Sequence, residues 1–78
     1  MTNRQKFETQ LEIQLTTLLQ TPKYAIARRE NTPASLAAKL TEALSKKTAF
    51  IDGDAVKAAC KTLGVKRTAT AIALFLQN

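Results

Sequence analysis

The sequence contains no histidine and only one cysteine, Cys60. A zinc site needs about four ligands, mostly cysteine and histidine, and a nucleophilic cysteine normally needs a histidine base. One cysteine also forms no internal disulfide, on which small secreted domains usually depend. These absences predict a protein that is not an enzyme, that holds no metal or other cofactor and that works in the cytoplasm.

Glycine and proline are also scarce, with two residues of each. This scarcity favours helices over a β fold with many turns. Gly53 and Gly64 stand far apart, so they form no glycine-rich phosphate loop. The longest apolar run, residues 71–76, is much shorter than a membrane span, and we expect no association with a membrane.

Acidic residues are half as numerous as basic ones, 6 against 12, which gives a net charge of +6. The one close pair of carboxylates, Asp52 and Asp54, is too short a series for a calcium loop and is interpreted as a helix start. An excess of positive charge suits an anionic partner such as nucleic acid, an acidic protein or a membrane surface. The alternative is that the charge serves solubility alone.

With 78 residues, the chain is expected to form one domain, in which 45% of the residues are apolar. A chain of this length buries only roughly 60% of the surface that it exposes when unfolded. A second copy would add burial, so a homodimer is one expectation. Apolar residues recur at the helical period along the chain, and this recurrence predicts an all-α fold, a compact bundle of four to five short helices.

The first expected helix is amphipathic and covers residues 4–20 within the N-terminal segment 1–20. Phe7, Leu11, Leu15 and Leu18 recur at the helical period, and Thr2 or Asn3 can cap the start. Two apolar residues, Ile13 and Leu19, lie outside this stripe. They either widen the buried face or contact a second subunit.

Thr21-Pro22 is expected to end the first helix and to open a short helix or turn over residues 23–30. The helices that follow are expected to form a helical core over residues 33–78, and Thr32-Pro33 opens the first of them, over residues 33–46. The apolar stripe of that helix is Leu36, Leu40 and Leu44. Phe50 and Ile51, in the connector that follows, are expected to fill the core.

Residues 54–77 are expected to form two helices around a tight turn. Asp52 is the expected cap of the first, which buries Val56, Ala59, Cys60 and Leu63 and ends at Gly64 in a left-handed conformation. Thr68 is the expected cap of the second, whose inward residues are Ile72, Phe75 and Leu76.

This segment resembles the helix-turn-helix class of DNA-binding motifs over residues 55–76. Cys60 is the small residue before the turn, Gly64 the turn glycine and Val65 the apolar residue after it. The chain departs from the pattern because Thr70 and Ala73 stand where apolar residues are usual, while Ile72 and Phe75 lie two residues later. The resemblance implies a second helix that enters a major groove of DNA, with Thr70, Ala73 and Gln77 facing outward.

The sequence therefore predicts a small, basic, non-enzymatic protein that binds nucleic acid, with double-stranded DNA as the expected partner, as a regulator of transcription or accessory factor of a phage or plasmid. Specific recognition would call for a homodimer. The alternative is a helical protein-interaction module, an inhibitor or adaptor with a protein partner, that uses exposed apolar residues such as Ile13 and Leu19. The candidate contact residues for nucleic acid are Lys66, Arg67, Lys57, Lys61, Lys46, Lys47, Thr68, Thr70, Arg28 and Arg29.

Overall fold

Four α-helices and no strands make up the part of the chain that the structure, a computed structural model, describes: residues 2–22, 31–49, 51 and 53–77. The helices are α1 (Asn3–Leu18), α3 (Pro33–Ser45), α4 (Asp54–Leu63) and α5 (Ala69–Gln77). The molecule measures 33 × 23 × 21 Å along its principal axes. The prediction of a compact all-helical bundle is confirmed. The short helix predicted over residues 23–30 lies outside the described residues.

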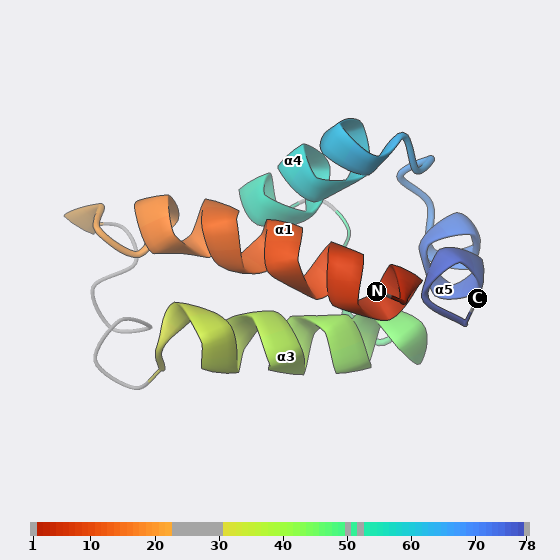
Figure 1. Cartoon of the computed structure of the whole chain (residues 1–78), viewed down its shortest axis with the longest axis horizontal. Helices are drawn as coiled ribbons and strands as arrows, with labels where there is room; N and C mark the ends of the chain where they lie inside the picture. The colour runs from red at the N-terminus through yellow and green to blue at the C-terminus, as the bar shows by residue number, and fades with distance from the viewer. Residues whose placement is uncertain (1, 23–30, 50, 52, 78) are drawn as a thin grey trace.

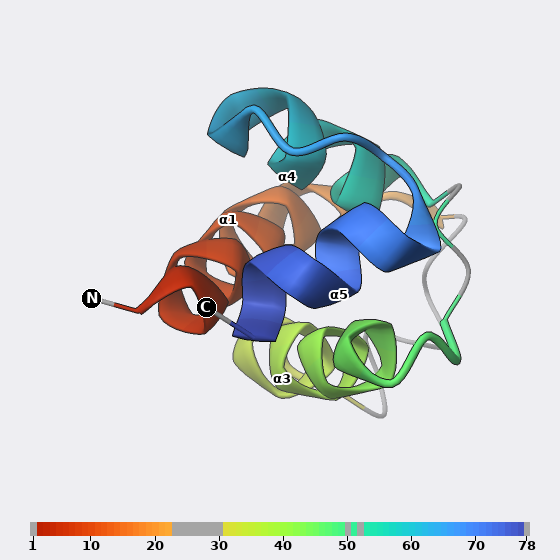
Figure 2. The same cartoon turned by 90° about the vertical axis from the view of Figure 1, so that its right-hand side faces the viewer.

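Helix α1 is the central element of the bundle. It runs antiparallel to α3 on one side, and α4 crosses it on the other (Figure 1). Helix α5 closes one end, where it packs against both α1 and α3 (Figure 2). The N-terminal half of the chain therefore supplies the surface on which the C-terminal half is assembled.

Threonine side chains begin three of the four described helices. Thr2 Oγ1 accepts a hydrogen bond from the backbone N–H of Gln5 at 3.1 Å, and Gln5 Oε1 accepts one from Thr2 N–H at 2.9 Å. This reciprocal pair is a capping box. Thr32 caps α3 ahead of Pro33, and Thr68 caps α5, as predicted. Thr21 donates its hydroxyl to the carbonyl of Leu18 at the end of α1; the short helix that it is expected to open lies outside the described residues.

The core is built around one stripe of α1. Phe7, Leu11 and Leu15 are buried, and the ring of Phe7 lies 6.2 Å from that of Phe75 on α5, at an interplanar angle of 55°. Leu19 is also buried, so the expectation that it is an exposed apolar residue is wrong. It lies four residues after Leu15 and therefore continues the same stripe. Ile13, on the opposite side of α1, is 52% exposed.

The start of α4 differs from the prediction, and its end agrees with it. The N-cap is Gly53, which makes no side-chain capping bond, whereas Asp52 lies outside the described residues, as does Phe50. Gly64 ends the helix with φ = 70°. The N–H of Val65 then donates to the carbonyl of Cys60 at 2.9 Å. This bond is the long return bond of a Schellman turn.

None of the helices in the described ranges has the length and apolar character that crossing a lipid bilayer requires.

Among the described residues, Thr41 is the one polar residue that is buried in the core, and it provides a test of the packing. Thr41 lies in α3 and is fully buried, and its hydroxyl oxygen has no hydrogen-bond partner. A buried polar group without a partner costs about 1–3 kcal/mol. We expect Thr41→Val, which keeps the shape of the side chain, to raise the free energy of unfolding by about 1 kcal/mol in urea denaturation.

Thr62→Val is the matched control, because Thr62 is exposed on α4. This substitution should change stability by less than about 0.5 kcal/mol. A loss of stability in Thr41→Val would mean that the hydroxyl is satisfied in solution and that the packing around it differs from the structure.

Candidate nucleic-acid interface

Two lysines lie one turn apart on the outward face of α4. The opposite face is buried through Ala55, Val56, Ala59 and Cys60, so the helical period places Lys57 and Lys61 on the side that faces solvent. Both are exposed. Lys61 is in the last turn of the helix, where a positive charge also interacts favourably with the helix dipole. The helical spacing alone therefore places the two lysines on one face, and their proximity does not depend on tertiary packing.

The turn between α4 and α5 carries the next two cations. Gly64 reverses the chain, Val65 packs against the core, and Lys66 and Arg67 are exposed. The carbonyl of Lys66 accepts a hydrogen bond from Thr68 N–H at 2.9 Å, and Thr68 Oγ1 accepts one from Ala71 N–H at 3.1 Å. These bonds hold the two cations directly before the N-terminus of α5. That end of a helix is itself partially positive.

Arg67 differs from Lys66 because it also interacts within the domain. Burial raises the pKa of the Cys60 thiol, and the positive charge of Arg67 opposes part of this rise. Arg67 therefore lies close enough to the end of α4 to influence its buried face. Lys66 is the simpler probe of surface charge in this turn.

The other basic pair follows α3. Lys46 Nζ lies 3.1 Å from Glu42 Oε1, and Glu42 also pairs with Arg4 at the start of α1. Lys47 has φ = 60°, the only positive φ of a non-glycine residue in the described ranges. The N–H of Thr48 closes the turn on the carbonyl of Ala43 at 2.9 Å. Lys47 thus occupies the left-handed position after a helix, where glycine is preferred.

Helix α5 offers little with which to read bases. Ile72, Ala73 and Leu76 are buried, so the expectation that Ala73 faces outward is wrong. The helix is covered by both α1 and α3, which buries a wider face than a single neighbour would. Its exposed positions are Thr70, Leu74 and Gln77, none of them charged. Direct recognition of bases usually depends on Arg, Lys, Asn or Gln side chains.

The two basic turns lie at the same end of the molecule. In Figure 2, α5 runs between the turn 64–68 and the C-terminal end of α3, so the turns flank it on opposite sides. Figure 1 shows both at the end of the bundle where α1 begins. Two pairs of the predicted cations, Lys46 with Lys47 and Lys66 with Arg67, therefore lie in turns at one end of the bundle, on opposite sides of α5. Arg28 and Arg29, also predicted as contacts, lie outside the described residues.

Glu42 forms ion pairs with Arg4 and Lys46 that were not predicted from the sequence. Its spacing of four residues from Lys46 is a recognised helical ion-pair pattern and could have indicated that pair. Its contact with Arg4 depends on the packing of α1 against α3 and has no sequence signature. Within the described residues, no three side chains of His, Cys, Asp or Glu are grouped as metal ligands would be.

Comparison with known proteins finds no matching family, no matching curated protein and no matching solved structure.

The Arg4–Glu42–Lys46 cluster predicts a defined response to pH. Hydrogen bonds from Arg4, then from Lys46, together with their charges, hold the pKa of Glu42 below its ordinary value of 4.5. A carboxylate with a lowered pKa in the folded state stabilises the fold above the unfolded pKa, and this contribution is lost as the pH falls through the folded pKa. The Tm difference between wild type and Glu42→Gln should therefore be largest above pH 4.5 and shrink below it.

Because the cluster is exposed, added salt should reduce this difference at neutral pH. A difference that persists unchanged into strong acid would show that Glu42 contributes through packing rather than through its charge.

Proposed function

We propose that this chain is a non-enzymatic protein that binds double-stranded DNA through the phosphate backbone. The observation that carries the proposal is the distribution of charged residues from α4 to the C-terminus. Residues 55–78 contain Lys57, Lys61, Lys66 and Arg67 and no acidic residue, and all four side chains are exposed. A basic surface without interspersed acids attracts polyanions strongly and releases their counterions on binding.

The arrangement favours contacts to phosphates over contacts to bases. The cations lie on the outer face of α4 and in the turns, whereas α5 presents uncharged side chains. Phosphate contacts fix position without reading sequence, and base-edge contacts supply specificity. Thr70 and Gln77 are the polar side chains of α5 available for base edges. The proposed binding is therefore mainly electrostatic.

The start of α5 strengthens the proposed contact at Lys66 and Arg67. Backbone N–H groups at a helix N-terminus are donors suited to phosphate oxygens. Thr68 satisfies one of these donors, that of Ala71. Two cations placed just before such a terminus complement a phosphate group from both the side chains and the backbone.

Size and charge suit an accessory or regulatory factor of a phage or plasmid, and a homodimer would be required for recognition of a two-fold symmetric site.

The alternative function is a protein-interaction module. It is favoured by Ile13 and Leu74, whose side chains are 52% and 55% exposed. A protein partner that purifies with the chain in equal amounts and without nucleic acid would favour the alternative.

The first test compares two lysines that differ in position and not in charge. Lys66→Ala should weaken binding to a DNA duplex several-fold and reduce the slope of log affinity against log salt by about 1. Lys39→Ala is the control. Lys39 is exposed on α3 and is not one of the proposed contact residues; its Nζ donates to Asn31 Oδ1 at 2.7 Å. The measurement is a fluorescence anisotropy titration at several salt concentrations.

Equal losses in the two variants would mean that net charge alone governs affinity and that the proposed site is wrong. Affinity that ignores salt would contradict binding through phosphates altogether.

The second test uses the left-handed backbone of Lys47. Replacing a non-glycine residue there by glycine relieves about 1 kcal/mol of backbone strain, so Lys47→Gly should be more stable than wild type and yet bind DNA more weakly. Lys47→Ala should lower affinity similarly without the gain in stability. Thermal unfolding and the same anisotropy titration give both quantities.

Gly64→Ala is the reverse control, because Gly64 has φ = 70° and a Cβ there would meet no atom within 4 Å. Its cost, about 1 kcal/mol, would come from the backbone alone. Unchanged affinity in both Lys47 variants would remove Lys47 from the proposed interface.

A further inference from the structure

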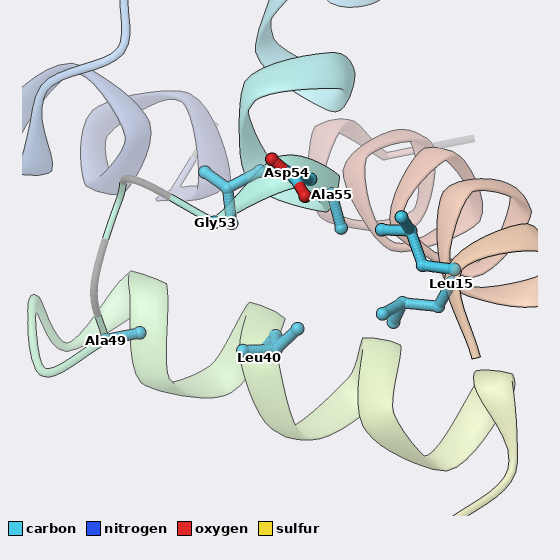
Figure 3. A pocket seen from close by; sticks show the side chains of 8 residues that line it. Leu15, Leu40, Ala49, Gly53, Asp54 and Ala55 are labelled. Atoms are coloured by element: carbon cyan, nitrogen blue, oxygen red, sulfur yellow. The ribbon is translucent and has the colours of Figure 1, made fainter. Parts of the chain in front are cut away.

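A pocket of about 370 Å³ opens between α1, α3 and the start of α4 (Figure 3). Leu15 and Leu18 of α1 form one wall, and Leu40 and Ala49 form another. The third wall is the first turn of α4, through residues 53–56. In Figure 3 the side chains of Leu15, Leu40 and Ala55 converge on the space, and Asp54 lies at its edge.

The volume of the pocket lies within the range of small-molecule sites, which is about 300–1,000 Å³. The walls are almost entirely aliphatic and offer water few partners. A pocket with these properties gains free energy when an apolar group displaces its water.

Among the described residues that line the pocket, Asp54 alone carries a charge. Asp54 is the first residue of α4, and it is exposed at the edge of the pocket. No described residue forms a salt bridge with it; the two recorded pairs both involve Glu42. A carboxylate beside an apolar space attracts a cationic head group and repels an anionic one.

We propose that this pocket binds a small amphiphilic cation, an aliphatic chain with an amine at one end. The chain occupies the space between Leu15, Leu40 and Ala49, and the amine lies beside the carboxylate of Asp54. The proposal is independent of DNA binding, because the pocket is at the beginning of α4 and the basic turn follows its end.

Octylamine, octanol and octanoate have similar chains and differ in head group, so they separate the two parts of the proposal. We expect octylamine to bind in a 1:1 ratio by titration calorimetry and to raise the Tm, since a ligand of the folded state stabilises it. Octanol should bind several-fold more weakly, and octanoate weakest. This order opposes the positive net charge of the protein, which by itself would favour octanoate.

Two variants locate the site. Ala49→Phe fills the pocket and should lower octylamine affinity about tenfold or more, whereas Ala38→Phe, at an exposed position of α3 that does not line the pocket, should leave it unchanged. Asp54→Asn should bring octylamine and octanol to equal affinity. Glu8→Gln, about two turns of α1 away from Leu15, removes the same charge and should preserve the preference for octylamine.

Three results would overturn the proposal. The first is the absence of saturable binding of any of the three molecules to the wild-type chain. This result would overturn the proposal even if binding appeared in Phe50→Ala, because the pocket would then exist only after the Phe50 side chain is removed. The second is equal affinity in Ala49→Phe and Ala38→Phe. The third is a preference for octylamine that survives Asp54→Asn, which would refute the assigned head group even if Ala49→Phe fails to fold.

Discussion

Burial of one stripe of α1 is the interaction on which the rest of the structure depends. Phe7, Leu11 and Leu15 are buried in the hydrophobic core, and α3, α4 and α5 all pack against α1. A chain of 78 residues has little redundancy in its core. The orientations of α4 and α5, and with them the positions of the cations, follow from how they pack on this helix.

The fold separates two kinds of surface along α4. Its first turn borders the aliphatic pocket, and its outward face and last turn carry lysines. A ten-residue helix spans about 15 Å, which is enough to keep an apolar site and a charged one apart. Both surfaces depend on the same buried residues, Val56 and Ala59 among them, so damage to the core of α4 would affect both.

Local features of the structure could be predicted from the sequence, and features that depend on tertiary packing could not. Thr32-Pro33, Gly64 and Thr68 specify helix ends through bonds to residues within one turn, and the predicted ends of α3, α4 and α5 agree with the structure to within one or two residues. Ala73 was misplaced because α5 packs against both α1 and α3, which no local pattern encodes. The lysines of α4 were predicted as a pair because their spacing is helical. The pairing of Arg4 with Glu42, and the pocket itself, join residues distant in the chain and have no signature in one sequence.

The central position of α1 has a consequence for the order of folding. Helix α1 is synthesised before α5, yet its stripe is complete only with α5, because Phe7 meets Phe75 once α5 has emerged from the ribosome. Until then the stripe is covered at most by α3 and α4, and its apolar surface remains open to chaperones or to other nascent chains. Contacts between such distant residues raise the contact order of a helical protein and slow its folding relative to a simple helical hairpin.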